Sequence, residues 1–218
     1  MAEVFQKGTL YLCATPIGNL EDITYRTVRC LTEADIIAAE DTRHTRQLLS
    51  AYGIETPLTS YHEHNKGEKG PLLIERLQDG DMVAVVSDAG LPGICDPGSD
   101  LVREALAASI PVVPLPGANA GLTGLIASGL DTTLFTFVGF LPKTKRHRRP
   151  VLEGLKEYGG TLIFYEAPHR IEGVLAEIEE VLGDRPAVLC RELTKKYEEY
   201  IRGSLSCVRQ RLQEQGCR

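Results

Sequence analysis

Five short polar segments in this sequence each follow an apolar, strand-like run, and they carry side chains that can move protons or hold charge. The segments are TPIGN at 15–19, EDTR at 40–43, HEHN at 62–65, SDAG at 87–90 and PGAN at 116–119. Carboxylates and imidazoles can accept protons, and arginines can bind phosphate or a developing negative charge. Because the carboxyl ends of parallel strands meet at one edge of a sheet, we expect these segments to share one ligand-binding rim.

Residues 82–98, MVAVVSDAGLPGICDPG, are the centre of this pattern. The run 82–86 is short, continuous and rich in valine, which predicts a fully buried strand. The irregular loop that follows takes about a dozen residues, whereas most loops between a strand and a helix take about 2–6. Its glycines allow the backbone to approach a ligand closely, and Asp88 could accept hydrogen bonds or hold a cationic group. A loop that merely needs turn residues is the alternative.

The EDTR and HEHN segments each have a simpler interpretation as well. Asp41 or Thr42 could cap the following helix, although capping leaves Arg43 and Arg46 at the same rim unexplained. The HEHN segment has the HxH spacing of a metal-ligand pair, but it has no third ligand nearby. We therefore expect no metal, and interpret HEHN as a polar rim segment that touches substrate, with a plain solvated loop as the alternative.

The second half of the chain contains a dense basic run, PKTKRHRR at 142–149, although the net charge of the chain is −6. That net charge argues against broad electrostatic binding of nucleic acid, but a local patch can still contact phosphate. We interpret the run as a loop that leads into a helix at 148–157, with RNA phosphate as its partner and a solvated loop as the alternative. The predicted RNA-contacting residues are Lys143, Lys145, Arg146, Arg148 and Arg149.

Alternating apolar runs and amphipathic stretches predict the elements that hold these segments. Strands are expected at 9–14, 34–39, 57–60, 82–86, 110–115, 136–140, 161–165, 187–190 and 197–202. Helices are expected at 24–31, 43–51, 67–79, 99–109, 118–128, 148–157, 170–182 and 205–213. The repeated strand–helix order predicts an α/β fold with a parallel sheet in an N-terminal domain, 1–117. Only a turn separates the last two strands, which predicts antiparallel pairing and a mixed sheet in a C-terminal domain, 118–218.

Composition and missing motifs limit the possible functions. The six cysteines, at 13, 30, 95, 190, 207 and 217, form no CxxC pair, so we expect reduced thiols in a cytosolic protein. The sequence shows no secretory signal and no apolar span of about 18 residues, which predicts a soluble, cytoplasmic protein without a membrane partner. The dinucleotide fingerprint GxGxxG and the phosphate loop GxxxxGK[ST] are absent, which disfavours NAD and ATP. An adenosine-type ligand without a phosphate chain would need neither motif.

Eight blocks of the sequence, in order, resemble the signature blocks of the ribosomal RNA small subunit methyltransferase I family. This family belongs to the tetrapyrrole-methylase-like, class III S-adenosylmethionine methyltransferases. The blocks are TLYLCATPIGNLEDIT, AAEDTRHTRQLL, SYHEHN, VAVVSDAGLPGICDPG, PLPGANAGLTGLIASGL, FVGFLP, FYEAPHR and CRELTKKYEEYIRG. They run from about Gly8 to Gly203, nearly the whole chain. Members often continue into a small C-terminal helical piece, whereas this sequence ends at Arg218, and this departure bears on RNA affinity.

The resemblance implies two α/β domains, S-adenosylmethionine folded into the cleft between them, and a homodimer. It also implies methyl transfer to the ribose 2′-oxygen of a cytidine in the decoding region of small-subunit ribosomal RNA, either as free RNA or in the 30S subunit. Carried over by motif, the implied cofactor contacts are Pro16, Ser87, Asp88, Ala89, Leu91, Asn119, Ala120, Tyr165 and Leu193. Several of these residues would act through backbone atoms.

A ribose hydroxyl is a weak nucleophile, so a base within hydrogen-bond reach and a nearby cation would both help the transfer. The candidate bases are Glu40, Asp41, Glu63, His64 and Glu166, and the candidate cations are Arg43 and Arg170. The EDTR and YEAPHR strand ends are preferred, with Glu166, His169 and Arg170 expected to face the cleft between the domains.

Two rival functions remain. A tetrapyrrole C-methyltransferase would share the fold, but its first loop usually resembles GxGPGD rather than TPIGN, and it does not need the basic run. A non-catalytic RNA-binding or ribosome-assembly protein would use the basic run alone, and it would not need the rim of strand-end motifs.

Overall fold

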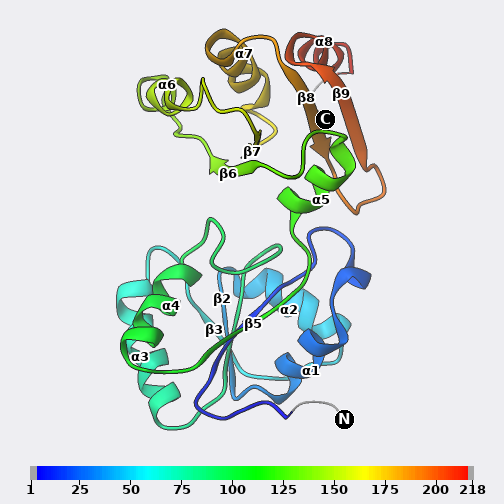
Figure 1. The fold of residues 1–218 in the computed structure, drawn as a ribbon. Coiled ribbons are helices and arrows are strands. Elements are labelled where there is room, and N and C mark those ends of the chain that lie inside the picture. Colours follow the sequence, from blue (N-terminus) through cyan, green and yellow to red (C-terminus); the bar gives the residue numbers. More distant parts are fainter. Residues whose placement is uncertain (1–3, 216–218) are drawn as a thin grey trace. The chain divides into compact units, whose positions relative to one another are not determined.

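The structure, a computed structural model, describes residues 4–215 (Figure 1). The described chain forms two compact units, one that ends at Asn119 and one that begins at Ala120. We call them unit 1 and unit 2.

Unit 1 is an α/β unit whose strands are all parallel, as the alternating pattern predicts. Its strands are β1 (Leu10–Cys13), β2 (Ile36–Ala39), β3 (Leu58–Ser60), β4 (Val83–Val86) and β5 (Val112–Leu115). Its helices are α1 (Tyr25–Glu33), α2 (Thr42–Ala51), α3 (Lys66–Gln78) and α4 (Gly98–Ala107), with a short 3-10 turn, η1, at Leu20–Asp22. Within the described residues the strands hydrogen-bond in the order β3-β2-β4-β1-β5.

Alternate residues of the unit 1 strands pack on opposite faces of the sheet. One core cluster joins β1, β2 and β4 to α1 and α2, with members that include Tyr11, Ile37, Ala84, Leu31 and Leu49. The other joins the same strands to α3 and α4, with members that include Leu10, Ile36, Val83, Leu73 and Leu101. Burial on both faces explains why the strands are apolar throughout and lack an alternating pattern.

The strand order places a reversal of direction between β1 and β4. From β1 the chain crosses toward β2 through α1, which covers one face, and from β4 it crosses toward β5 through α4, which covers the other. Open α/β sheets bind ligands outside the carboxyl ends of the strands at such a reversal. The loops after β1 and β4 are therefore the place where unit 1 can hold a ligand.

Unit 2 combines parallel and antiparallel strand pairs. Its elements are α5 (Ala120–Ser128), β6 (Phe135–Phe140), α6 (Lys145–Gly154), β7 (Thr161–Tyr165), α7 (Ile171–Leu182), β8 (Pro186–Arg191), β9 (Glu199–Ser204) and α8 (Leu205–Gln215). Strands β6 and β7 are parallel, and β8 and β9 pair antiparallel as predicted. One mixed sheet was predicted, but in the described residues the parallel pair and the antiparallel pair are separate two-stranded sheets. The core of this unit includes Leu152, Ile178, Ile201, Val208 and Leu212.

The prediction that residues 142–149 form a loop is wrong. Helix α6 begins at Lys145, so most of the basic run is helical. Arg148 and Leu152, four positions apart, are the buried residues of this helix, and Arg148 pairs with Glu177 of α7. A run of basic residues predicts exposed side chains. The burial of Arg148 depends on Glu177, which is far away in the sequence, so the run itself does not reveal it.

Among residues 4–215, no helix combines the length and apolar character that crossing a membrane requires. Cys13, Cys30, Cys95, Cys190 and Cys207 are all free thiols. The sixth cysteine, Cys217, lies outside the described residues.

Candidate functional site

The loops after β1 and β4 are joined at the sheet reversal. Thr15 and Gly90 exchange two backbone hydrogen bonds, of 2.9 and 3.0 Å. The Thr15 hydroxyl donates to the Ser87 carbonyl at 3.1 Å, and the Ser87 hydroxyl donates to the Gly90 carbonyl at 3.2 Å. The structure therefore brings the TPIGN and SDAG segments together, with the Ser87 side chain used to hold the loop in shape.

Glycines permit this close packing of loops. Gly90 has φ +84°, in the left-handed region that favours glycine. At Gly117, in the PGAN segment after β5, an added Cβ would lie 2.5 Å from the Cβ of Ala14. The loops after β1, β4 and β5 are therefore in direct contact at one edge of the sheet.

The EDTR segment after β2 joins the same rim through Asp88. The backbone N–H of Asp41 donates to Asp88 Oδ1 at 3.0 Å, which ties the loop after β2 to the loop after β4. The Asp41 side chain caps α2, since its Oδ1 accepts from the Arg43 N–H at 2.8 Å. Its Oδ2 also lies 2.9 Å from Nη2 of Arg43, whose side chain is 86% exposed. The hydrogen bonds from Arg43 hold the pKa of Asp41 well below its usual range, so Asp41 is a weak proton acceptor.

Glu40 has the opposite electrostatic environment. Partial burial raises the pKa of Glu40, and the negative charges of Asp88 and Asp96 raise it further. No ion pair to Glu40, Asp88 or Asp96 exists among the described residues. We call these three residues the carboxylate cluster. A carboxylate that binds its proton more tightly than usual is better suited to accept one in a reaction.

Asp96 belongs to the long loop after β4, and the sequence did not assign it a specific role. Its Oδ1 accepts from the backbone N–H groups of Gly93 and Gly98 at 2.8 and 2.7 Å, which shapes the loop before α4. Its Oδ2 is buried without a hydrogen-bond partner among the described residues. Burial raises the pKa of Asp96. The CDPG sequence was a usable signal, because an aspartate before Pro-Gly commonly organises a turn.

The HEHN segment forms a turn before α3. Asn65 Oδ1 accepts from the His62 N–H at 2.8 Å, and the rings of His62 and His64 lie 6.0 Å apart. Glu63 pairs with Lys66 at 2.8 Å. Across the described residues, no group of three or more histidine, cysteine, aspartate or glutamate side chains is arranged to hold a metal ion.

In unit 2, the YEAPHR segment divides into an aromatic part and a charged part. The Tyr165 hydroxyl accepts from the Gly121 N–H at 2.8 Å, and the Tyr165 ring stacks edge-on against Phe137 and Phe140. Glu166 Oε1 accepts from the Ala167 N–H, and its Oε2 lies 3.2 Å from Nη2 of Arg170. The Glu166 side chain is 4% exposed and its carboxylate is ion-paired with Arg170, so Glu166 is a poorer base candidate than Glu40.

The remaining predicted cofactor residues lie on loops or at element ends. Pro16 follows the bridge residue Thr15, Ala89 and Leu91 flank Gly90, and Asn119 and Ala120 lead into α5. Leu193 lies between Glu192 and Thr194, which have φ of 54° and 65°. Two non-glycine residues with positive φ on either side of Leu193 store backbone strain, which is common at binding loops.

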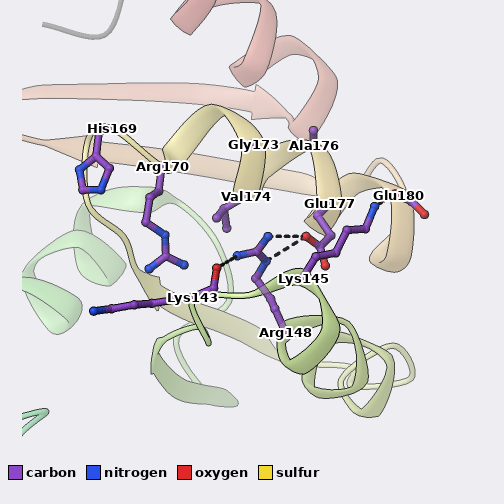
Figure 2. A pocket seen from close by; sticks show the side chains of 10 residues that line it. All are labelled: Lys143, Lys145, Arg148, His169, Arg170, Gly173, Val174, Ala176, Glu177 and Glu180. Carbon is purple, nitrogen blue, oxygen red and sulfur yellow. Dashed lines mark hydrogen bonds and ion pairs between the residues drawn. The ribbon is translucent and has the colours of Figure 1, made fainter.

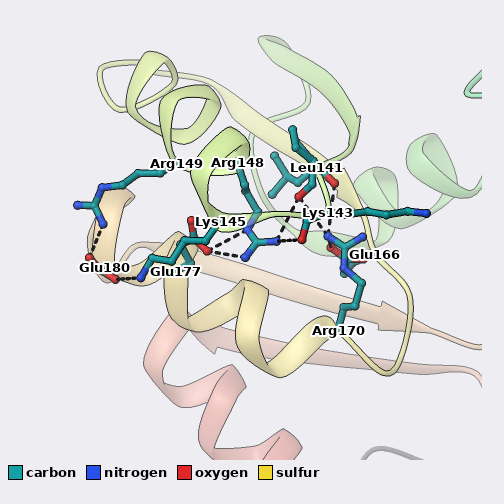
Figure 3. A network of polar contacts seen from close by, with 10 residues as sticks. Leu141, Lys143, Lys145, Arg148, Arg149, Glu166, Arg170, Glu177 and Glu180 are labelled. Carbon is teal, nitrogen blue, oxygen red and sulfur yellow. Dashed lines mark hydrogen bonds and ion pairs between the residues drawn. The ribbon is translucent and has the colours of Figure 1, made fainter.

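The basic run does not act as one surface (Figure 3). Arg148, 9% exposed, pairs with Glu177 at 2.6 Å, which does not suit the predicted contact with RNA phosphate. Arg149 pairs with Glu153 and Glu180 at 3.0 and 2.5 Å, and Lys145 pairs with Glu180 at 3.4 Å. Lys143 and Arg146 are exposed, and neither has an ion-pair partner in the described part of the chain.

The family model for Tetrapyrrole (Corrin/Porphyrin) Methylases matches residues 9–208, so the fold is that of this class of proteins. The solved structure of uroporphyrin-III C-methyltransferase from Thermus thermophilus in complex with S-adenosylhomocysteine has the same fold. Its TM-score is 0.62 at 20% identity, over 93% of this chain and 90% of that one.

Two curated relatives are much closer in sequence. Ribosomal RNA small subunit methyltransferase I of Halalkalibacterium halodurans is 57% identical over 91% of this chain and 69% of its own length. Its counterpart in Bacillus subtilis is 55% identical over 91% of this chain and 68% of its own length. The chain belongs to the ribosomal RNA small subunit methyltransferase I family.

Proposed function

We propose that this protein transfers a methyl group from S-adenosylmethionine to the ribose 2′-oxygen of a cytidine in the decoding region of small-subunit ribosomal RNA. Identity of 57% to a relative named for small-subunit ribosomal RNA methylation is the observation that carries the proposal. The joined loops at the sheet reversal, with an unpaired carboxylate cluster beside them, provide a place for such chemistry. A homodimer is part of the same proposal, and sedimentation would measure it.

The residues at the strand ends fit S-adenosylmethionine. A ligand without a phosphate chain needs hydrogen-bond acceptors for its amino and hydroxyl groups, and the loop after β4 supplies them. Asp88 Oδ1 accepts from the Asp41 N–H, which leaves Asp88 Oδ2 as an available acceptor. Asp96 Oδ2 is buried without a hydrogen-bond partner among the described residues. We assign the cofactor contacts to Pro16, Ser87, Asp88, Ala89, Leu91 and Asn119 of unit 1 and to Ala120, Tyr165 and Leu193 of unit 2. When bound, the cofactor supplies a sulfonium methyl group.

The protein must also activate the ribose hydroxyl. Glu40 is our first candidate for the group that accepts the hydroxyl proton, because its pKa is raised by burial and by neighbouring carboxylates. Asp41 is less suited, since its charge is stabilised by Arg43. Arg43, which is mostly exposed, remains a candidate for substrate phosphate.

The unpaired cations of the basic run are the proposed RNA contacts. Lys143 and Arg146 are exposed and lack ion-pair partners in the described residues, so a phosphate does not have to compete with a carboxylate for them. Lys145 and Arg149 are left out of the proposed RNA contacts, because Lys145 pairs with Glu180 and Arg149 pairs with Glu180 and Glu153.

Methyl transfer from labelled S-adenosylmethionine tests the proposal directly. The acceptors are small ribosomal subunits from cells that lack this activity, with naked small-subunit RNA alongside. Label in a 2′-O-methylated cytidine is the expected result, and Asp88→Ala should reduce cofactor binding measured by calorimetry. Cofactor binding without label in either acceptor would contradict the proposed substrate, and a tetrapyrrole acceptor would be tried next.

A further inference from the structure

Unit 2 contains a pocket of about 460 Å³ between the segment that follows β6 and the first turns of α7 (Figure 2). Its lining residues are Lys143, Lys145, Arg148, His169, Arg170, Gly173, Val174, Ala176, Glu177 and Glu180. The volume lies within the range of about 300–1,000 Å³ that small-molecule sites occupy. Five of the ten lining side chains are basic and two are acidic, so the balance between them decides what the pocket attracts.

At one end of the pocket the charges cancel. Glu177 Oε2 accepts from both Nε and Nη2 of Arg148, at 2.9 and 2.6 Å, so the more buried acid of the pocket is paired with that guanidinium. Glu180 has Lys145 at 3.4 Å and Arg149 at 2.5 Å. Both carboxylates are therefore neutralised within the pocket and do not repel an anion at its other end.

At the other end, the basic side chains have N–H groups that no group of the described chain accepts. All contacts of Arg170 pass through Nη2, which faces Glu166 Oε2 and the carbonyls of Leu141 and Pro142. Its Nε and Nη1 have no partner in the described chain, so one side of the guanidinium remains open. Lys143 and His169 also lack ion-pair partners there, and Figure 2 shows both side chains on the same side of the pocket as Arg170. We call these three residues the phosphate end.

This arrangement matches the recognition of a phosphodiester. An arginine held in place by a carboxylate and by backbone carbonyls presents its free N–H groups at a fixed position, and a planar guanidinium suits the oxygens of a phosphate. A lysine nearby adds a point charge without fixing geometry. Contacts of this kind position a nucleic acid without specifying its sequence.

We infer that the phosphate end binds a backbone phosphate of the RNA substrate. The inference rests on the proposed function and narrows it, because it selects Lys143, His169 and Arg170 over the paired cations of α6. It also gives Arg170 a positioning role toward RNA, in place of contact with the reacting oxygen.

Gly173 offers a way to test the pocket without disturbing the fold. It lies in α7 and lines the pocket, and a Cβ at this position would have no neighbour within 4 Å. Gly173→Glu places a negative charge in the pocket, and Gly173→Gln adds the same bulk without charge. Lys143→Gln removes one unpaired cation, and Lys145→Gln removes a neutralised cation from the same pocket as the matched control.

The experiment measures the affinity of each variant for a fragment of small-subunit ribosomal RNA by fluorescence anisotropy over a series of salt concentrations. Loss of one phosphate contact should lower the slope of log affinity against log salt by about 0.7–0.9. We expect this change for Lys143→Gln and Gly173→Glu, a smaller one for Gly173→Gln, and none for Lys145→Gln.

Slopes equal to wild type in both Lys143→Gln and Gly173→Glu would overturn the inference, as would a wild-type protein that binds no RNA. Binding of inorganic phosphate that depends on Lys143, together with RNA binding that does not, would assign the pocket to a free phosphate and would also overturn the inference. Methyl transfer measured in parallel separates the two proposals. Label with unchanged slopes refutes only the pocket, and changed slopes without label refute only the proposed reaction.

Discussion

The carboxylate cluster of unit 1 and the pocket of unit 2 differ in whether their acidic side chains are paired with cations. In unit 1, Glu40, Asp88 and Asp96 lie at a sheet edge without an ion-pair partner in the described residues, and burial, followed by repulsion from the other two carboxylates, raises the pKa of Glu40. In unit 2, the pocket acids Glu177 and Glu180 are both paired. An unpaired carboxylate with a raised pKa is suited to accept a proton. In the pocket the carboxylates are already paired with cations, so the remaining basic side chains can bind an anion.

The largest expected effect concerns Glu40. Glu40→Gln should slow methyl transfer by about 10²–10⁴-fold, the usual contribution of a positioned general base, while cofactor affinity measured by calorimetry stays close to wild type. Asp41→Asn should lose less, because Arg43 already stabilises that carboxylate. Equal losses in the two variants would show that the raised pKa of Glu40 does not identify the base.

The next largest effect concerns the buried ion pair between Arg148 and Glu177 and its contribution to stability. Glu177→Ala leaves Arg148 buried and uncompensated, which should lower the free energy of unfolding by about 3–5 kcal/mol. Urea denaturation followed by circular dichroism measures this change. The double variant Arg148→Met, Glu177→Leu should recover most of the loss, since it removes both charges and keeps apolar volume. Glu180→Ala, in an exposed pair, is the matched control and should leave the midpoint unchanged.

A smaller effect compares one glycine from each region. Gly117→Ala should destabilise the protein by about 1–3 kcal/mol, because its Cβ would overlap that of Ala14 in the packed loops of unit 1. Gly173→Ala in α7 meets no neighbour and should stabilise the protein by about 0.4–1 kcal/mol. Thermal unfolding of both variants provides the test, and a harmless Gly117→Ala would mean that the rim loops are not tightly packed.

The smallest expected effect is a dependence of stability on pH. A carboxyl whose pKa is raised by folding stabilises the native state below its unfolded pKa, and this contribution is lost as pH rises through the folded pKa. Because the pKa of Glu40 is raised, Glu40→Gln should unfold at a higher temperature than wild type near neutral pH. The difference should disappear in acid, below the usual pKa of a glutamate. A lower midpoint for the variant at neutral pH would contradict the proposed electrostatics.

The fold of unit 1 could be predicted because each element carries its own pattern. The valine-rich run at 82–86 becomes β4, and the helix expected at 67–79 is α3, at Lys66–Gln78. Burial on both faces makes such strands apolar throughout, and that property is local to each segment. The convergence of TPIGN, EDTR, SDAG and PGAN follows as well, since parallel strands place their carboxyl ends at one edge.

The pairing of charges could not be predicted in the same way. Arg148 and Arg149 are neighbours in one basic run, yet Arg148 is buried against Glu177 and Arg149 lies half-buried beside Glu180. The position of the Asp96 carboxylate is fixed by hydrogen bonds from two backbone N–H groups, and these come together only when the loop is folded.

The sequence by itself determined the α/β fold, the family and the rim of strand-end motifs. The tertiary structure decided which acids are free to take a proton and which cations are free to take a phosphate. The physical reason is that apolar periodicity acts over a few residues of one element, whereas the energy of a charge depends on its burial and on partners that folding brings from distant segments.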